Sequence, residues 1–399
     1  MKNVFLTGST GFLGGELVKR LVKQQPQANL FLLVRNRGKQ PATARFAEML
    51  GGWATELKMP VAELETRLHL VEGDLVLPAL GIPDAQRREL TEKVDTIFHL
   101  AASIDLLGKY EKLHRTNLGG TRSILQFAAE TNAAGGLNRF HYVSTAYVSG
   151  QRRGRVLEHE LDKGQSFSND YERVKWQAEK EVQAAKATLP ITIYRPSIVI
   201  GDSRTGYAPD DCATLDFLKM LFTGKMPFIP GSRRLKMDLI SVDYVADAIA
   251  HLSTLSDETL GQTFHLVAGK NNCLSSFELA QIGKNVVENM HAQHGNPGSL
   301  RLPFKVHPLL AMAGVWVCSR LKTKIPAKLV QFWMTYSTYN WYCKEYDDSN
   351  AVRLLEKAGI HKPSPVESLR VTLRRNLDLD LPYTFTPDWS KDARFEFGF

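Results

Sequence analysis

A glycine-rich turn close to the start of the chain places the strongest constraint on the fold. Residues 4–14 read VFLTGSTGFLG, so an apolar segment runs directly into Gly8, Gly11 and Gly14 at every third position. Such a turn has a bare backbone that lets a pyrophosphate approach the N–H groups at the start of a helix. A glycine triplet can also form a turn that binds nothing. Because this one stands between a strand and a helix, we expect it to bind cofactor phosphates through Thr7, Gly8, Ser9, Thr10, Gly11, Phe12, Leu13 and Gly14.

Short β-branched segments alternate with longer helical patterns through the first half of the chain. This alternation is typical of βαβ units, in which helices cover both faces of a parallel sheet. Apolar residues at three- and four-residue spacing predict helices over Leu13–Lys23, Tyr110–Glu130 and Tyr171–Ala187. The sequence therefore predicts an α/β fold with a doubly wound parallel sheet, whose strands we place at Asn3–Thr7, Asn29–Val34, His69–Gly73, Thr96–Leu100, Phe140–Ser144 and Thr192–Tyr194.

The alternation breaks after about residue 200. Loop-rich segments follow, and residues 295–346 are crowded with Trp, Tyr, Met and Leu. Two later stretches, Asp238–Leu252 and Thr263–Val267, read as returns to the main sheet. We therefore predict a dinucleotide-binding domain over 1–200 with returns at about 236–270, and a smaller, mostly helical substrate lobe over 201–235 and 271–399.

The aromatic segment of the second lobe has three interpretations. It suits a pocket for a long apolar chain, with Lys322, Lys324 and Lys328 beside it to meet coenzyme A phosphates or an acidic carrier protein. Aromatic helices in a small lobe also commonly form its core. The apolar stretch Pro308–Val317 is too short to cross a membrane, but it could lie on one.

Basic residues follow the second predicted strand, where an acidic residue would bind the ribose hydroxyl of NAD. Arg35 and Arg37 stand there instead and favour a 2′-phosphate, so we expect NADP(H), although two solvated arginines would look the same. Asp74 and Leu75 could contact the adenine, or Asp74 could simply form a turn. The fourth strand ends in Leu100, Ala101 and Ala102, where small side chains would let the cofactor pass close to the backbone. We expect the neighbouring His99 to be buried and hydrogen-bonded within the protein.

Three polar side chains carry the predicted chemistry. Thr145 follows the fifth strand, and Tyr171 and Lys175 come four residues apart at the start of the next helix, so both lie on one helix face. An ammonium beside a phenol favours the phenolate, so we expect Lys175 to lower the pKa of Tyr171. We expect the Thr145 hydroxyl to hold the substrate oxygen. Without the cofactor turn, the same spacing would also fit an ordinary surface pair.

These motifs together resemble the extended short-chain dehydrogenase/reductases, over about residues 1–270. The glycine turn, the Thr145, Tyr171 and Lys175 set, RTNLGGT around Asn117, RPSIVIG from Arg195 and VDYVADAI from Val242 carry the resemblance. Within that family TGSTGFLG, LLVRNR, VEGDL and YVSTAYVSG are most similar to the thioester reductase and fatty acyl-CoA reductase branch. The resemblance implies a Rossmann sheet, places Pro196, Ser197 and Ile198 near the nicotinamide, and gives Asn117 a role in ordering its helix and a relay water. An Asn that caps local backbone is the other interpretation.

The resemblance implies hydride transfer from NADPH to an acyl thioester, bound to coenzyme A or to a carrier protein, giving an aldehyde and then an alcohol. Tyr171 and Thr145 would stabilise and protonate the oxyanion, and Lys175 would hold the nicotinamide ribose. Two alternatives stay open. The same residues would oxidise or reduce a hydroxyl or ketone on a sterol-like or 3-hydroxyacyl substrate, and a silent site would make the chain an NADP-binding regulator.

The net charge, the cysteines, the histidines and the N-terminal segment agree with a reductase that binds an anionic cofactor. The net charge of +8 favours anionic partners, while the scattered Lys and Arg do not predict a nucleic-acid surface. The four Cys form no C-x-x-C pair and the histidines no H-E-x-x-H motif, so we expect neither a disulfide framework nor a metal site. The glycine turn begins too early for a signal peptide, so we expect a cytoplasmic chain, with any membrane contact peripheral. The oligomeric state is not predicted.

Overall fold

The computed structural model divides into two compact units, which are described separately. It describes residues 1–106, 108–210, 212–223, 228–230, 236–295, 300, 302, 304–306 and 344–377. The first unit comprises Met1–Ser197, Val242–Gly269 and Lys344–Lys362, and the second comprises the remaining stretches, Ile198–Ser241, Lys270–Cys343 and Pro363–Phe399. The aromatic stretch, the three lysines and Pro308–Val317, on which a substrate pocket or membrane contact was predicted, lie outside the described residues.

A parallel sheet forms the centre of the first unit. Within the described residues it has seven strands in the order β12-β7-β5-β4-β1-β2-β3, and every neighbouring pair is parallel. The strand order reverses between β1 and β4, which is where ligands bind in doubly wound sheets. The strands are β1 (Asn3–Thr7), β2 (Asn29–Val34), β3 (Leu68–Glu72), β4 (Thr96–His99), β5 (Arg139–Val143), β7 (Ile191–Pro196) and β12 (Thr263–Leu266).

These strands confirm the predicted doubly wound α/β fold. β1 and β2 have the predicted bounds, β4 ends one residue earlier than predicted, and β3 and β5 each begin and end one residue earlier. β7 extends the predicted core of Thr192–Tyr194, and every residue of it is buried. Continuous burial is what a parallel sheet covered on both faces requires, and it explains why these segments are apolar rather than alternating.

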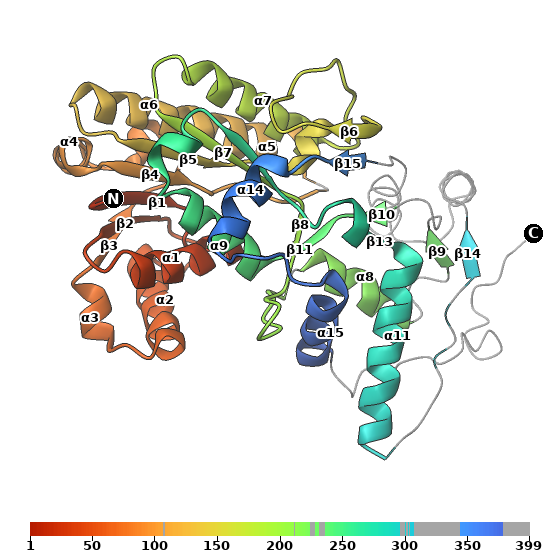
Figure 1. The fold of residues 1–399 in the computed structure, drawn as a ribbon. Helices are drawn as coiled ribbons and strands as arrows, with labels where there is room; N and C mark the ends of the chain where they lie inside the picture. The colour runs from red at the N-terminus through yellow and green to blue at the C-terminus, as the bar shows by residue number, and fades with distance from the viewer. Residues whose placement is uncertain are drawn as a thin grey trace, which may run out of the picture. The chain divides into compact units, whose positions relative to one another are not determined.

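Helices cover both faces of this sheet (Figure 1). On one side α1 packs against α9, and on the other α4, α6 and α7 pack in sequence. The predicted helix Tyr110–Glu130 is interrupted by a π-helical turn over His114–Gly119, which lies between α5 and α6. The helices are α1 (Phe12–Gln24), α2 (Ala42–Leu57), α3 (Val61–Glu65), α4 (Asp84–Lys93), α5 (Tyr110–Leu113), α6 (Gly120–Ala133), α7 (Asp170–Ala185), α9 (Val242–Leu252), α10 (Ser256–Thr259) and α14 (Ser349–Lys357).

A late segment of the chain also belongs to the first unit. Strand β15 (Lys344–Tyr346) pairs in parallel with β6 (Gly154–Val156), and α14 packs against β12 and α9. Glu158 is buried and accepts hydrogen bonds from the backbone N–H groups of His265 (3.0 Å) and Asn350 (3.0 Å). Burial raises the pKa of Glu158 to about 7, against the opposing effect of these bonds.

The second unit has its own apolar core. Leu215, Leu218 and Phe222 of α8 pack in one cluster with residues of α11 and α15. The predicted return Asp238–Leu252 is split in the structure: β11 pairs with β8 in the second unit, and only α9 lies in the first. The elements are β8 (Ile198–Ile200), α8 (Ala213–Phe222), β9 (Phe228–Pro230), β10 (Lys236–Met237), β11 (Leu239–Ser241), β13 (Leu274–Ser275), α11 (Ser276–Gln293), β14 (Phe304–Val306) and α15 (Pro365–Asn376).

In the described part of the chain no helix is both long and apolar enough to span a bilayer. Among these same residues, His, Cys, Asp and Glu side chains do not gather in groups of three or more that could hold a metal ion.

Candidate active site

The glycine turn joins β1 to α1 and leaves the start of α1 bare. Gly8 has a φ of +85°, and a Cβ there would lie 2.7 Å from the backbone nitrogen of Ala101. A Cβ at Gly14 would overlap the Gly8 carbonyl, so two glycines are required by close backbone approach. Gly11 precedes α1 without a side-chain cap. The α1 helix therefore begins without a side-chain cap, which is how the helix at a pyrophosphate site begins.

A buried hydroxyl in this turn fits a phosphate ligand. The Ser9 side chain is 1% exposed, and its Oγ has no hydrogen-bond partner among the described residues. A buried hydroxyl is normally paired, so this donor fits an oxygen that the protein itself does not supply. Thr10 is exposed, and Phe12 and Leu13 are half-buried on the first turn of α1. The turn therefore fits the phosphates of a dinucleotide.

The ends of β1 and β4 are tied together beside the turn. Thr7 Oγ1 and His99 Nδ1 are 2.7 Å apart, and the Ala101 N–H donates to Thr7 Oγ1 over 3.3 Å. Leu100 donates its N–H to the Thr7 carbonyl over 3.2 Å. Burial lowers the pKa of His99 to about 3, with a smaller effect from Lys175. The expectation of a buried, satisfied histidine is confirmed, and Ala101 and Ala102 follow at the edge of the sheet where the strand order reverses.

Three arginines gather after β2. Arg35 and Arg37 are exposed, and Arg45 of α2 donates to the Arg35 carbonyl over 2.6 Å. The pKa of Arg45 is lowered by burial and then by the charges of Arg37 and Arg35. Guanidinium groups that repel one another are suited to an anion between them. Sequence analysis missed Arg45, because it comes from a helix whose position only the fold reveals.

The acidic turn after β3 faces this group. Asp74 Oδ2 lies 3.6 Å from an Arg35 nitrogen, and Asp74 Oδ1 accepts the Val76 N–H over 3.2 Å. Asp74 thus forms a turn, which was one of its two predicted roles. Leu75 is buried in the core of the first unit, so the predicted contact of these two residues with adenine stays a prediction.

Thr145 and Tyr171 form the centre of the candidate site. Thr145 follows β5, and its Oγ1 donates to the Pro196 carbonyl over 3.4 Å and accepts the Tyr147 N–H over 3.3 Å. Tyr171 is the second residue of α7, which begins where the Asn169 side chain accepts the Glu172 N–H over 2.9 Å. Thr145 also lies close enough to Tyr171 that hydrogen bonding from its hydroxyl lowers the pKa of the phenol, against the larger effect of burial. Two hydroxyls that meet in this way can both contact one substrate oxygen.

Lys175 is buried but makes contacts other than those predicted. Its Nζ donates to the Val143 carbonyl over 3.0 Å and to Tyr142 Oη over 3.2 Å, and it lies 4.7 Å from the centre of the Tyr142 ring. Burial lowers the pKa of Lys175 to about 8, against the opposing charge of Glu179. The predicted lowering of the Tyr171 pKa is wrong. Burial raises it to about 12, and the bond from Thr145, rather than Lys175, opposes this rise.

One face of α7 carries a further buried polar side chain that sequence analysis missed. Glu179 comes four residues after Lys175, so Tyr171, Lys175 and Glu179 form one stripe. Both Glu179 and Arg195 are fully buried and paired, with Arg195 Nε 3.0 Å from Glu179 Oε1, and Ser144 Oγ donates to Glu179 Oε2 over 2.5 Å. Burial would raise the pKa of Glu179, but Arg195 and Ser144 hold it below its usual value. The four-residue spacing was the signal that could have found it.

Asn117 acts on the loop after β4. It lies in the π-helical turn, where π segments often mark functional sites. Its Oδ1 accepts the Ser103 N–H over 2.7 Å, and its Nδ2 donates to the Ser103 carbonyl over 2.9 Å. The side chain thus binds local backbone, which was one of its two predicted roles.

Three further residues were predicted to lie near the nicotinamide. Pro196 lies beside Thr145, Ser197 donates its N–H to the Leu266 carbonyl over 3.2 Å, and Ile198 begins the second unit.

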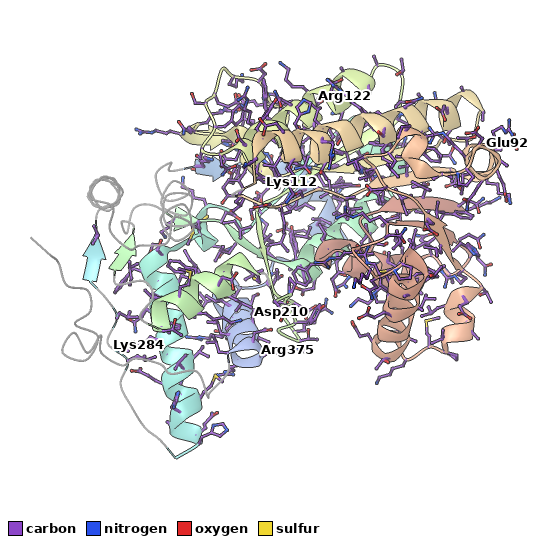
Figure 2. All side chains as sticks on the ribbon, turned by 180° about the vertical axis from the view of Figure 1, so that it is seen from behind. Glu92, Lys112, Arg122, Asp210, Lys284 and Arg375 are labelled. Carbon is purple, nitrogen blue, oxygen red and sulfur yellow. The ribbon has the colours of Figure 1, made fainter. Side chains whose placement is uncertain are left out.

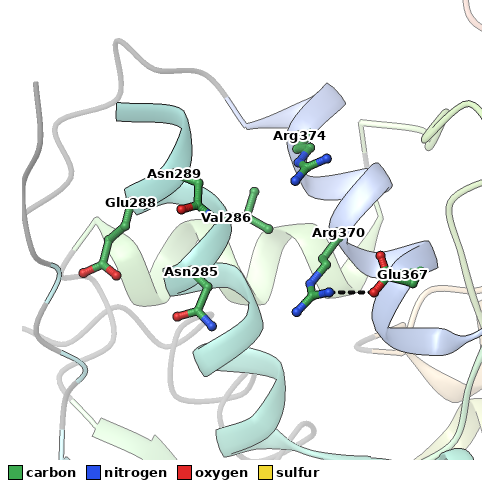
Figure 3. Close-up of a pocket in the computed structure, with 7 residues that line it drawn as sticks. All are labelled: Asn285, Val286, Glu288, Asn289, Glu367, Arg370 and Arg374. Carbon is green, nitrogen blue, oxygen red and sulfur yellow. Dashed lines mark hydrogen bonds and ion pairs between the residues drawn. The ribbon is translucent and has the colours of Figure 1, made fainter. Parts of the chain in front are cut away.

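The second unit has a surface pocket that is lined mainly by polar and charged side chains. It is formed by α11 and α15, and Figure 3 shows polar and charged side chains directed into it. Arg370 pairs with Glu367 over 2.6 Å within it. This lining does not suit an apolar acyl chain. The residues are Asn285, Val286, Glu288, Asn289, Glu367, Arg370 and Arg374.

Known proteins similar to this chain carry the same kind of domain. The NAD-binding family model described as "Male sterility protein" matches residues 6–249. The nonribosomal peptide synthetase asaC of Aspergillus flavus is 29% identical over 279 residues, covering 66% of this chain and 26% of that protein. The fatty acyl-CoA reductase wat of Drosophila melanogaster is 27% identical over 279 residues, covering 62% of this chain and 53% of that protein.

A solved structure matches over almost its full length. The terminal R domain from the myxalamid PKS-NRPS biosynthetic pathway has a TM-score of 0.73 and 29% identity, and the match covers 94% of this chain and 90% of that one. This chain thus spans about half or less of the two curated relatives, but nearly all of the solved domain. The family match includes the glycine turn and the whole stripe of α7.

Proposed function

Because the chain belongs to the NAD-binding family described as male sterility protein, we propose that it uses NADPH to reduce the carbonyl of an acyl thioester. The observation that carries this proposal is the pair of neighbouring hydroxyls, Thr145 and Tyr171, at the carboxyl end of the sheet that also bears the glycine turn. Extended short-chain dehydrogenase/reductases are NAD(P)-dependent oxidoreductases. The likeness to a synthetase R domain and a fatty acyl-CoA reductase supports a thioester as the acceptor.

The cofactor proposal rests on the groups around the turn. The uncapped start of α1 and the Ser9 hydroxyl fit the pyrophosphate, and the Arg35, Arg37 and Arg45 group fits a 2′-phosphate. A nicotinamide cofactor is therefore expected of the family, and NADPH rather than NADH is our proposal. When bound, this cofactor supplies a hydride to the carbonyl carbon.

The side chains of the site supply the proton and hold the oxygen. As the carbonyl carbon gains a hydride, its oxygen gains negative charge, which Thr145 stabilises by hydrogen bonding and Tyr171 neutralises by giving up its proton. The hydroxyl of this intermediate then returns its proton to the Tyr171 phenolate as the carbon–sulfur bond breaks, the thiolate leaves and takes a proton from solvent, and the product is an aldehyde. A second hydride and a second proton give the alcohol.

The raised pKa of Tyr171 supports reduction as the direction. A phenol with a pKa of about 12 keeps its proton at neutral pH and is ready to act as an acid. Oxidation of an alcohol needs a phenolate as base, which this environment disfavours. The second candidate acts on a hydroxyl or ketone of a sterol-like or 3-hydroxyacyl substrate, and its oxidative direction is therefore less well supported than reduction of a carbonyl.

NADPH consumption tests the proposal directly. We expect oxidation of NADPH with palmitoyl-CoA or an acyl carrier protein thioester, release of a free thiol, and an aldehyde or alcohol in the products. Turnover confined to a panel of 3-ketones would favour the second candidate instead. Tight NADPH binding without turnover on either class would indicate a regulator, and both outcomes would contradict the proposal.

A further inference from the structure

A line of buried hydroxyl groups connects Lys175 to the π-helical turn. Lys175 Nζ donates to Tyr142 Oη over 3.2 Å, and the Thr121 side chain lies close enough to the Tyr142 hydroxyl that hydrogen bonding between them affects the pKa of Tyr142. Thr121 Oγ1 in turn donates to the Asn117 carbonyl over 2.6 Å. Tyr142, Thr121 and Lys175 are 1%, 2% and 3% exposed, so the line is shielded from solvent.

The same line reaches the strand that carries the glycine turn. His99 Nε2 lies 3.2 Å from Thr121 Oγ1, and His99 Nδ1 lies 2.7 Å from Thr7 Oγ1. Because His99 is neutral, one ring nitrogen carries a proton and the other accepts one. The side chains of Thr7 on β1, His99 on β4, Tyr142 on β5 and Thr121 on α6 are thus connected in one line. Each of them has one proton to donate.

Counting those protons fixes the direction of the bonds. Thr121 gives its only hydroxyl proton to the short bond with the Asn117 carbonyl, so it must accept from both Tyr142 and His99. Tyr142 gives its own proton to Thr121, which leaves an oxygen lone pair facing Lys175. His99 then carries its proton on Nε2 and accepts from Thr7 at Nδ1. In this arrangement each of the Thr7, Thr121 and Tyr142 hydroxyls and the His99 ring donates one proton to one acceptor. The Tyr142 oxygen is left to accept a hydrogen bond from the Lys175 ammonium.

We propose that Tyr142 is a positioning residue that, oriented by Thr121, keeps the buried Lys175 amine charged and fixed at the end of β5. The proposal rests on the proposed function, in which Lys175 orients the cofactor beside Tyr171. A buried ammonium needs acceptors to stay charged, and among the described residues Lys175 Nζ donates to this hydroxyl and to the Val143 carbonyl. The charged or titratable groups around it are Glu179 and Tyr171 on its own helix, Tyr142 on β5 and His99 on β4.

The test compares two buried tyrosines on neighbouring strands. Tyr142→Phe removes the hydroxyl and keeps the ring, and Tyr194→Phe is the matched control, because the fully buried Tyr194 hydroxyl bonds His141 (3.1 Å) and not Lys175. The readout is the titration of Lys175, followed by the ¹³Cε shift in labelled protein without added cofactor and assigned with Lys175→Arg. Circular dichroism checks the fold of each variant.

We expect Tyr142→Phe to lower the titration midpoint of Lys175 by about one pH unit, because a hydrogen bond to a charged group is lost. Tyr194→Phe should leave the midpoint unchanged. The alkaline limb of the pH profile for kcat/KM should move down in parallel for Tyr142→Phe alone. An unchanged midpoint in Tyr142→Phe, or an equal shift in both variants, would overturn the proposal.

Thr121 provides a second route to the same answer if Tyr142→Phe does not fold. Thr121→Val should lower the Lys175 midpoint and Thr121→Ser, which keeps the hydroxyl, should restore it; no shift with Thr121→Val would contradict the orienting role. The titration needs neither substrate nor cofactor. A wild-type protein that reduces no thioester would therefore refute the proposed function and leave this measurement intact.

Discussion

Removing the charge of Glu179 should destabilise the protein far more than removing that of Glu181, two residues away on the same helix. Glu179 and Arg195 have side chains 0% and 1% exposed, and Arg195 reaches Glu179 through both Nε and Nη2. Glu179→Gln leaves a buried guanidinium without a counter-charge. Breaking a buried pair from one side costs about 3–5 kcal/mol of the free energy of unfolding.

The control carboxylate, Glu181 of the same helix, belongs to an exposed ion pair. Arg122, labelled on the surface in Figure 2, contacts Glu181 over 2.5 Å, with side chains 56% and 41% exposed. Exposed pairs contribute about 0–1 kcal/mol, because water screens them, so Glu181→Gln should change little. The comparison separates burial from helix position, since both substitutions remove one carboxylate from α7.

Urea denaturation followed by circular dichroism measures both variants. The midpoint should fall for Glu179→Gln with an unchanged slope, as expected when stability alone changes. The double variant Glu179→Met with Arg195→Met should recover part of the loss, because no charge is then left unpaired. If Glu179→Gln and Glu181→Gln lowered the free energy of unfolding equally, the inferred cost of the unpaired guanidinium would be refuted.

Three further predictions follow from the cofactor turn and the buried histidines. Arg35→Asp should weaken NADPH binding by tenfold or more and NADH binding little, by fluorescence titration; equal losses would contradict a 2′-phosphate site. Gly14→Ala should lower affinity for both cofactors, because its Cβ would overlap the Gly8 carbonyl, and wild-type affinity would contradict this. Burial lowers the pKa of His99, His141 and His265 to about 3, so the stability they contribute is present above pH 6.5 and is lost as pH falls toward 3. His141→Phe should reduce proton uptake on unfolding at pH 5 by about one, and an unchanged uptake would contradict the assignment.

The parts that the sequence predicted well are those set by local pattern. β1 and β2 have their predicted bounds because each is a short apolar segment between turn residues. The glycine turn followed from spacing, because close backbone approach leaves no alternative to Gly at positions 8 and 14. α4 was missed because its sequence, DAQRRELTEK, has a weak apolar periodicity.

The partners of the site residues could not be predicted, because they come from distant segments. Tyr142 lies 33 residues before Lys175 in a buried strand, where an aromatic residue reads as core. Only the packing of α7 on β5 shows that its hydroxyl faces the amine. The predicted effect of Lys175 on Tyr171 failed for the same reason: helical spacing puts both on one face, but burial and competing acceptors decide the pKa of each.

The central claim is that the Tyr171 hydroxyl gives its proton to a thioester carbonyl beside bound NADPH. Single-turnover kinetics of Tyr171→Phe with NADPH and an acyl thioester, together with NADPH affinity by fluorescence, measure this most directly. We expect affinity within about twofold of wild type and a rate lower by about 10²–10⁴-fold, the usual contribution of a general acid. Wild-type turnover by Tyr171→Phe would contradict the account.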